Sequence, residues 1–438
     1  MRAESAFKKG FIVDTEHNEQ PNNTLYDVII VGAGLVGACF ASLLKSARGK
    51  NGQRLNIAVV EAGAPPKPVD LSSDSAVSES GFDPRVVALT RSSQDTLASI
   101  GAWESIEALR CCPYTDMHVW DGDGTGSIHF NSFDIGETDL GHIVENSVAL
   151  HGVLQTLANA SNVEMIYGDG VEQLGGDQQQ RSLILSSGRV LSAPLIVAAD
   201  GSRSKIRELA AIAVRQWSYG HQAIVTTVQT ERSHQFTAWQ RFLSTGPLAF
   251  LPLHEATKGQ NASHFCSIVW SLNTDVAEQM MALSDDEFKQ ELGRAFEHRL
   301  GDIVVVDKRY SLPLWQRHAR EYIQPGLALI GDAAHSIHPL AGQGVNLGFL
   351  DAKVLAEEVI RAHKSGLNLN DFSLLRRFQR RRKGHNLAVM AIMEGFKRLF
   401  GARNLTVRLL RNMGIKQVDR LPLIKHTIAR EILSSGKN

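Results

Sequence analysis

Three glycines near the start of the chain have a spacing that suits the binding of a dinucleotide. Gly32, Gly34 and Gly37 form a G-x-G-x-x-G motif, and Glu61 follows the last of them by 24 positions. In this motif the first glycine permits a tight turn, the second lets the backbone approach a pyrophosphate, and the third lets a helix pack closely on a strand. The helix N-terminus offers N–H groups and a positive dipole end to phosphates. Because Glu61 would accept hydrogen bonds from ribose hydroxyls and repel a 2′-phosphate, the motif favours FAD or NAD over NADP, with a purely structural glycine turn as the alternative.

A second glycine-rich segment lies far along the chain and could bind a flavin. Its candidate ligand-binding residues are Asp332, Pro339, Gly342, Gln343, Gly344 and Asn346. The apolar run 327–330 predicts a strand that ends at Asp332, where ligands bind in open α/β sheets, so this carboxylate could hydrogen-bond a polyol or ribityl chain. The turn 341–344 opens a predicted helix over 345–363, whose dipole would favour an acceptor that gains negative charge, such as a reduced flavin. His335 and His338 are better explained as capping or packing residues.

These motifs require parallel strands that deliver them to one edge of a sheet. The run 26–31 predicts a buried strand, 38–47 a helix and 56–60 a second strand, which together form a βαβ unit. A further strand over 195–199 ends at Asp200, beside Arg203, Lys205 and Arg207. These three cations could meet an anionic electron donor or could form a solvated helix face. The segments 214–230, 239–253 and 265–272 predict a second, sheet-rich region.

Length and composition narrow the functional class. The chain has 438 residues with 46 basic and 46 acidic side chains, so no overall field argues for nucleic acid. Its four cysteines show neither a C-x-x-C pair nor zinc-ligand spacing, which makes a metal site or a disulfide framework unexpected. No apolar run reaches the length of a membrane span, and the first 25 residues lack a signal-peptide core. We therefore expect a cytoplasmic protein, or one attached peripherally to the inner face of the membrane.

The C-terminus departs from this charge balance. Residues 376–430 contain 15 Lys or Arg and only two acidic residues, Glu394 and Asp419. Such a basic, partly amphipathic region could dock on an anionic membrane surface or on an acidic partner complex. The alternative is a solvated helical cap on the nucleotide-binding domain.

Three motifs in this order resemble the fingerprints of the FAD-dependent aromatic hydroxylases, the single-component flavoprotein monooxygenases. They are the glycine motif at 32–37, the segment 199–207 with Asp200-Gly-Ser-Arg, and the segment 331–347 with Gly331-Asp332-Ala-Ala-His. Within that superfamily, residues 140–147, 246–253, 266–272 and 338–347 resemble the ubiquinone-biosynthesis hydroxylases, particularly the bacterial polyprenylphenol hydroxylases. The similarity runs from Tyr26 to Ile432. An N-terminal extension and a polar insertion around 66–82 depart from the family pattern.

The resemblance implies an α/β fold in which a Rossmann-like FAD-binding domain is interleaved with a β-sheet substrate domain and followed by a helical C-terminus. The expected FAD-binding domain comprises 25–112, 140–213 and 322–364, and the expected substrate domain comprises 113–139 and 214–321. Residues 1–24 are expected to be a flexible extension and 365–438 a basic helical region.

The resemblance also implies the chemistry. FAD would be bound non-covalently, with Arg85 near the flavin and Asp200 supporting both FAD and the docking of NAD(P)H or another electron donor. A C4a-hydroperoxide of the reduced flavin would hydroxylate the ring of a polyprenylated phenol, with C5 of 2-polyprenylphenol as the specific expectation. Because the cofactor performs the hard step, no catalytic base is identified. Hydroxylation at another ring position or of another phenol, a flavin-dependent dehydrogenase, and a non-catalytic binder of prenylated ligands remain alternatives.

Overall fold

The computed structural model describes residues 23–67, 69, 81–122, 124–254, 263–336 and 343–401. Several residues of the sequence analysis lie outside these ranges. They are the extension up to residue 22, most of the polar insertion, His338, Pro339, Gly342 and the C-terminus beyond 401. The side chain of Gln343 is not described either.

The predicted nucleotide-binding sheet has six strands. Its strand order is β20 (Ile323–Gln324), β21 (Leu327–Leu329), β13 (Leu195–Ala198), β2 (Val28–Val31), β3 (Ile57–Glu61) and β9 (Val163–Tyr167). All neighbours are parallel except β20 and β21. The strands β2 and β13 are buried throughout, as continuous β-branched and apolar runs require when helices or loops cover both faces. The predicted βαβ unit is thus confirmed.

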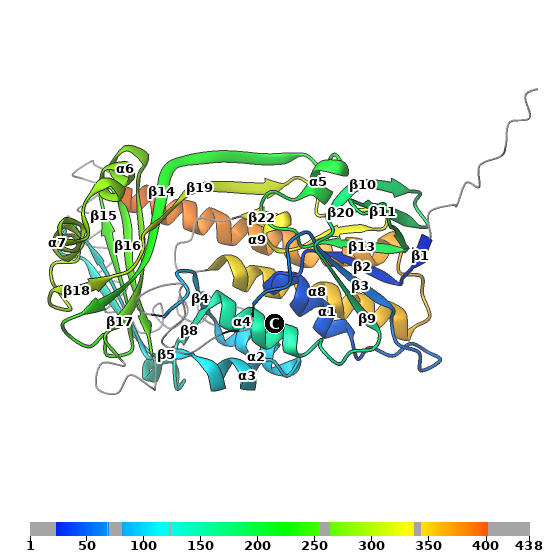
Figure 1. Ribbon diagram of the computed structural model, residues 1–438, viewed down its shortest axis with the longest axis horizontal. Helices are drawn as coiled ribbons and strands as arrows, with labels where there is room; N and C mark the ends of the chain where they lie inside the picture. The colour runs from blue at the N-terminus through cyan, green and yellow to red at the C-terminus, as the bar shows by residue number, and fades with distance from the viewer. Residues whose placement is uncertain are drawn as a thin grey trace, which may run out of the picture.

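Two long helices of this region pack against each other beside the sheet. Helix α1 (Leu35–Leu44) contacts α8 (Gln343–Lys364), although the two are separated by most of the chain. Figure 1 shows both below the sheet. Helix α1 begins earlier than predicted, so the third glycine of the motif lies inside it, where α1 and the preceding turn approach closely. A further four-stranded sheet adjoins, with β1 (Asn23–Leu25), β12 (Val190–Ala193), β11 (Arg181–Leu185) and β10 (Val171–Gly176) in that order. The flexible extension expected over 1–24 was placed too far along the chain, because Asn23 and Thr24 belong to β1, which pairs with β12.

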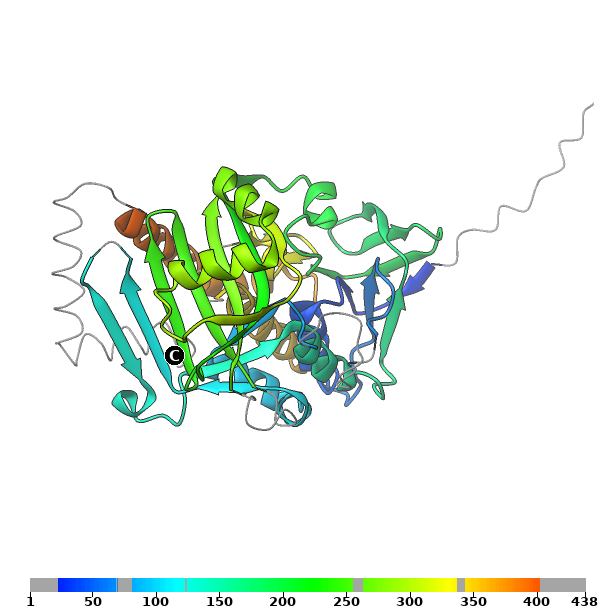
Figure 2. The ribbon, with the colours of Figure 1, turned by 60° about the vertical axis from the view of Figure 1, so that its left-hand side comes forward.

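The predicted sheet-rich region forms one large sheet with nine strands. In order they are β22 (His335–Ser336), β19 (Tyr310–Ala319), β14 (Val214–Thr230), β17 (Phe265–Asn273), β16 (Gly246–Leu253), β15 (Thr237–Leu243), β6 (Asp116–Asp121) and β7 (Ser127–Asn131), while β18 (Ile303–Val306) pairs with β14. Figure 2 shows this sheet as a separate layer, with helices packed on its outer face. Those helices are α6 (Thr274–Ala282) and α7 (Asp285–Ala295). Phe250, Phe288 and Phe296 are among the residues that form the core beneath them.

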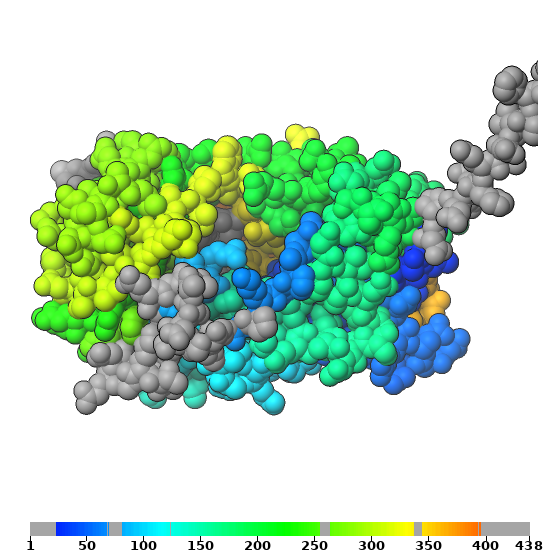
Figure 3. Space-filling view, viewed as in Figure 1, coloured from blue at the N-terminus to red at the C-terminus, as the bar shows by residue number. Residues whose placement is uncertain are grey.

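A three-stranded sheet lies between these two parts. It consists of β4 (Val86–Leu89), β8 (Gly141–Glu145) and β5 (Cys112–Tyr114), accompanied by α2 (Arg91–Ser99), α3 (Trp103–Leu109) and α4 (Asn146–Gln155). The remaining helices are α5 (Lys205–Leu209) and α9 (Phe372–Gly401). Strands β14 and β19 run from the large sheet toward α5 (Figure 1). The space-filling view shows a hollow between the two parts, bordered by the region of β19 and that of α4 (Figure 3).

Among the described helices, none is both long enough and apolar enough to cross a membrane. The described part of the chain therefore contributes no membrane-spanning helix.

One buried histidine makes the stability of the large sheet depend on pH. His234 precedes β15 and is inaccessible to solvent. Its Nε2 donates to the Leu253 carbonyl oxygen at 2.9 Å, and its Nδ1 accepts from the Phe236 N–H at 3.0 Å. Burial lowers the pKa of His234 to about 4. The neutral ring also supports a strained turn, because Gln235 and Phe236 have φ values of 54° and 52°.

Acidification is therefore expected to destabilise the protein through His234. An unfolded histidine has a pKa of about 6.5, so between about pH 6.5 and pH 4 the unfolded chain binds this proton and the folded chain does not. The site's contribution to the free energy of unfolding should be fully present above that window and fall by about 1.4 kcal/mol per pH unit on acidification. Urea denaturation at several pH values should show that the free energy of unfolding falls less steeply with acidification in His234→Gln than in the unsubstituted protein. Equal slopes in the two proteins would contradict the assignment.

Candidate functional site

The glycine-rich turn between β2 and α1 combines close packing with one open position. Gly32 has a φ of +104°, and a Cβ there would lie 2.4 Å from the Ala199 carbonyl oxygen. A Cβ on Gly37 would lie 2.0 Å from the Gly32 carbonyl oxygen. By contrast, a Cβ on Gly34 would meet no atom within 4 Å. Two of the motif's glycines are therefore required by packing, and the third borders open space.

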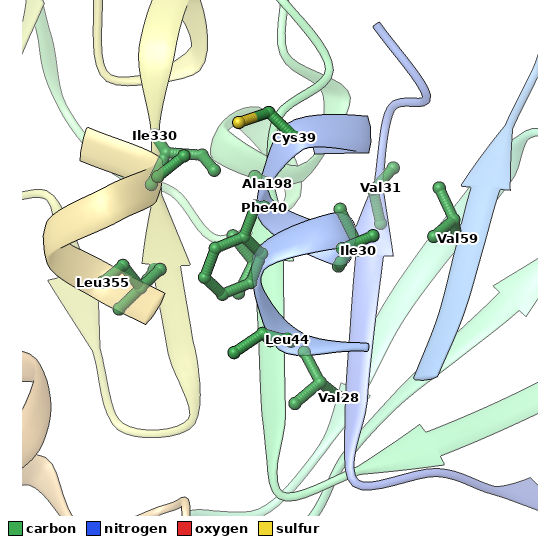
Figure 4. Packing of buried hydrophobic residues seen from close by; sticks show 14 of the residues in the cluster. Val28, Ile30, Val31, Cys39, Phe40, Leu44, Val59, Ala198, Ile330 and Leu355 are labelled. Atoms are coloured by element: carbon green, nitrogen blue, oxygen red, sulfur yellow. The ribbon is translucent and has the colours of Figure 1, made fainter. Parts of the chain in front are cut away.

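The hydrophobic core holds the helix behind this turn. Phe40 and Leu44 of α1 lie between the β2 side chains and Leu355 of α8 (Figure 4). Gly34 is the N-cap residue of α1 and supplies no capping side chain, and the first turn contains no acidic residue. No side chain caps the first N–H groups of α1, and the N-cap residue Gly34 borders open space, an arrangement typical of an anion-binding helix N-terminus.

A cavity of about 390 Å³ lies at this helix end. Gly34, Glu61, Asp200, Arg203 and Lys205 are among its lining residues. Glu61 ends β3, and its carboxylate accepts from the Ala33 N–H and the Gly63 N–H, each at 2.9 Å. The Glu61 carboxylate therefore stabilises the glycine-rich turn and also lines the cavity. Helix N–H donors, the Glu61 carboxylate and two exposed cations are groups that suit the adenosine diphosphate half of a dinucleotide, and Asp169 and Asp200 also line the cavity.

Asp200 stands at the end of β13, as predicted, and organises the next turn. Its Oδ2 accepts from the Ile206 N–H at 3.1 Å, which fixes the start of α5. Burial raises the pKa of Asp200. Of the three nearby cations, Arg207 is half-buried and is used within the protein, because it donates to the carbonyl oxygens of Ala333 at 2.8 Å and Ser202 at 2.9 Å. Only Arg203 and Lys205 remain exposed at the cavity.

A second cavity, of about 1120 Å³, contains the predicted arginine. It lies between α4 and the strands β14 and β19, in the hollow of Figure 3. Arg85 is exposed there and has no ion-pair partner within the described ranges. Arg110, which also lines this cavity, is instead held by Glu145 through Nε and Oε2 at 2.8 Å. Arg85 is thus an available cationic group at the boundary between the two parts of the molecule.

Asp332 lies in the short 3₁₀ turn Gly331–Ala333 that follows β21. Its side chain is exposed, whereas its neighbours Gly331 and Ala333 are buried. Surrounding protein raises the pKa of Asp332 by desolvation, while His335 and Arg317 oppose this shift. Asp332 therefore presents an exposed carboxylate at the carboxyl end of the parallel strands. This position suits the predicted contact with a polyol chain.

The residues predicted around the start of α8 separate into different roles. A Cβ on Gly344 would meet no atom within 4 Å, so the helix start is open there. Asn346, in contrast, is buried, and its amide is occupied by the β4–α2 segment. Its Oδ1 accepts from the Ser93 Oγ–H at 2.7 Å and the Thr90 N–H at 3.1 Å, and its Nδ2 donates to the Ala88 carbonyl oxygen at 2.7 Å. As placed, the Asn346 side chain holds the β4–α2 segment against α8.

Sequence reasoning missed a buried polar cluster behind the Asp332 turn. It contains His335, Asp351 of α8, and Arg382 and Asn386 of α9. The basic run 376–383 was interpreted by its charge alone, yet Arg382 is only 4% exposed. Helical spacing is the signal that could have found it, because Leu375 and Phe378, seven and four residues earlier, are buried on the same face.

Solved structures share this architecture. The crystal structure of p-nitrophenol 4-monooxygenase PnpA from Pseudomonas putida has a TM-score of 0.72 to this chain at 19% identity, covering 94% of this chain and 98% of that one. PqsL from Pseudomonas aeruginosa, a probable FAD-dependent monooxygenase, has a TM-score of 0.70 at 22% identity, covering 90% and 100%. A family model described as an FAD binding domain matches residues 152–390. The predicted fold class is thereby confirmed: this is the fold of the FAD-dependent aromatic monooxygenases.

Curated relatives show to which family of FAD-dependent monooxygenases the chain belongs. The 3-demethoxyubiquinol 3-hydroxylase of Escherichia coli is 32% identical over 399 residues, covering 91% of this chain and 96% of that protein. Ubiquinone hydroxylase UbiL of Rhodospirillum rubrum is 33% identical, covering 94% and 90%. The mitochondrial ubiquinone biosynthesis monooxygenase COQ6 of Xenopus tropicalis is 32% identical, covering 92% of each chain. The chain belongs to this family of ubiquinone-biosynthesis FAD-dependent hydroxylases and is an FAD-dependent monooxygenase.

Proposed function

We propose that this enzyme hydroxylates the ring of a polyprenylated phenol in ubiquinone biosynthesis. The observation that carries the proposal is the cavity at the uncapped start of α1, which brings Gly34, Glu61 and Asp200 together in a chain related over nearly its whole length to quinone-ring hydroxylases. The residues present fit FAD, because the cavity combines helix N–H donors with a ribose-binding carboxylate.

Each part of the site has an assigned task in this proposal. Glu61 holds the adenosine ribose, the α1 N-terminus and Arg85 hold the pyrophosphate, and Asp332 holds the ribityl chain. The start of α8, including Gly344, faces the flavin ring and stabilises negative charge on it through its dipole. When bound, FAD supplies the activation of oxygen after reduction by NAD(P)H or another donor. The protein must hold the phenol ring near the flavin and exclude water from the reacting atoms.

The remaining assignments follow from the same proposal. The segments 25–112, 140–213 and 322–364 would bind FAD, and 113–139 with 214–321 would cover the phenol. The basic C-terminal region would bring the site to an anionic membrane surface or a partner complex where a prenylated substrate resides. Arg376 and Arg380 are exposed on α9, as this requires. Arg377 and Arg381 pair instead with Glu358 at 2.9 Å and Glu357 at 2.7 Å.

The specific ring position proposed is C5 of 2-polyprenylphenol. A named relative acts as a 3-hydroxylase on 3-demethoxyubiquinol, so the family includes enzymes for another position. The test is deletion of the gene in its native host, followed by mass spectrometry of the lipid extract. Accumulation of a polyprenylphenol lacking the C5 oxygen is expected, and an intermediate lacking a different ring oxygen would move the assignment to that position.

A biochemical test separates hydroxylation from dehydrogenation. Purified enzyme with its donor, the accumulated lipid and ¹⁸O₂ should place one ¹⁸O atom in the ring. Conversion of the phenol without incorporation of ¹⁸O would replace the hydroxylase proposal with a flavin-dependent dehydrogenase.

A further inference from the structure

One buried carboxylate spans both ends of the turn that carries Asp332. Asp351, on α8, has no solvent exposure. Its Oδ2 accepts from the Gly331 N–H at 3.0 Å and from the His335 Nε2–H at 2.6 Å. Gly331 and His335 are the first and last residues of the segment 331–335. A single oxygen atom therefore binds both ends of this segment.

The other oxygen of the same carboxylate is held by α9. Asp351 Oδ1 accepts from Arg382 Nε at 2.7 Å and from Asn386 Nδ2 at 3.1 Å. The Arg382 guanidinium also donates to Asn386 Oδ1 at 2.6 Å and to the Leu347 carbonyl oxygen at 3.4 Å. Arg382 is 4% exposed and Asn386 is fully buried. The two α9 side chains thus fix the direction in which Asp351 faces the turn.

The outer side of the turn is held by different elements. Arg207 of α5 donates to the Ala333 carbonyl oxygen at 2.8 Å. Strand β22, which begins at His335, pairs with β19 through Arg317 and His318. Among the described side-chain contacts of the turn, the cluster of Asp351, Arg382 and Asn386 joins Gly331 to His335 while leaving the Asp332 side chain exposed.

The electrostatic composition of this cluster argues for a role beyond cohesion. Burial alone would raise the pKa of Asp351, but His335 and Arg382 hold it far below its usual range, so the carboxylate is ionised. Ionised groups are costly to bury, and an apolar cluster of the same volume would hold α8 and α9 together as well or better. The hydrogen bonds, unlike apolar packing, fix direction as well as distance.

We propose that Asp351, oriented by Arg382 and Asn386, is the positioning residue that sets the Asp332 carboxylate for its contact with the polyol chain of FAD. The proposal rests on the proposed function, in which Asp332 binds that chain. The basic helix α9 would then contribute to the cofactor site indirectly. Arg382 acts only through Asp351 and the Asp332 turn.

FAD titration of the apoprotein, obtained by removing flavin from the purified enzyme, tests the proposal. Arg382→Met and Asp351→Asn should each raise the Kd for FAD by about tenfold, the size of one lost charged hydrogen bond. Arg382→Lys, which keeps the charge and one donor, should recover part of this loss. Arg380→Met is the matched control, because Arg380 is exposed on the same helix, and its Kd should equal that of the unsubstituted protein.

A double-mutant cycle separates positioning from general stabilisation. If Arg382 acts through Asp332, then Arg382→Met should change the Kd for FAD by less than about twofold when Asp332→Ala is already present. A merely structural role predicts the same loss in both backgrounds. Additive effects, or an Arg382→Met protein with unchanged affinity, would overturn the inference.

The same measurements distinguish this inference from the proposed function. If Asp332→Ala leaves FAD affinity unchanged, the proposed cofactor site is wrong and the inference fails with it. If Asp332→Ala weakens binding and Arg382→Met does not, only the positioning role is lost. Should Arg382→Met fail to fold, the cycle is completed with Arg382→Lys. The loss of FAD affinity caused by Arg382→Lys must then disappear when Asp332→Ala is also present.

Discussion

Gly34→Asp is expected to weaken FAD binding by at least about 100-fold while leaving the apoprotein as stable as before or more stable. Gly34 has a φ of −69° and a ψ of 179°, which any residue adopts, and an added Cβ has no neighbour within 4 Å. An aspartate at this N-cap position would accept from the first N–H groups of α1 and add a favourable charge to the helix dipole. The same carboxylate would occupy the donors needed by the phosphates and repel them.

The opposite signs of the two effects make this variant informative. Thermal unfolding of the apoprotein reports on the helix, and FAD titration reports on the site. Gly34→Asn adds similar bulk without the charge, so it should lose less affinity than Gly34→Asp. If Gly34→Asp bound FAD as well as the unsubstituted protein, the pyrophosphate could not lie at the start of α1.

Asn346→Asp is expected to lower the free energy of unfolding of the apoprotein by about 3 kcal/mol. The substitution keeps the shape of the side chain but removes the Nδ2 donor, which lies 2.7 Å from the Ala88 carbonyl oxygen. A second oxygen would then face that carbonyl, and a charge would be buried at a position with 3% exposure. The β4–α2 segment would lose the Ala88 bond to α8 but keep the bonds from Ser93 and Thr90.

Urea denaturation of the apoprotein measures this effect. Asn368→Asp, at an exposed position after α8, is the control and should change the free energy of unfolding by less than about 0.5 kcal/mol. If Asn346→Asp left the stability unchanged and weakened FAD binding, the structural role would be wrong. The side chain would then bind the cofactor, as the sequence predicts.

Much of the architecture could be predicted because it depends on local rules. Apolar β-branched runs marked β2, β3 and β13, and the glycine spacing marked the turn before α1. Strand ends placed Glu61, Asp200 and Asp332 correctly relative to the sheet, since parallel strands present their carboxyl ends at one edge. The start of α1 was misplaced by three residues, because a glycine in a helix looks like an interruption when the close approach it serves is not known.

Side-chain roles that depend on distant segments could not be predicted. Asn346 and Arg207 both stand beside cofactor motifs, yet one serves the β4–α2 segment and the other serves the Ala333 carbonyl. Arg382 lies in the densest basic run of the chain and is nevertheless buried against Asp351. The charge of such a residue and the motif that contains it indicate which interactions it can make. They do not indicate which hydrogen-bond partner the fold places beside it.

The sequence by itself determined the turn at Gly32–Gly37, the acid at the end of β3 and the class of cofactor, because backbone conformation and strand periodicity are local properties. Tertiary structure alone decided which polar groups face the cavities and which are used internally. That choice depends on packing between segments separated by tens to hundreds of residues, as in the contacts of Asn346 with Ala88 and of Arg382 with Asp351. A buried polar group needs a hydrogen-bond partner, and that partner can lie on any segment that the fold brings close. The residues next to it in the sequence therefore do not reveal which partner it has.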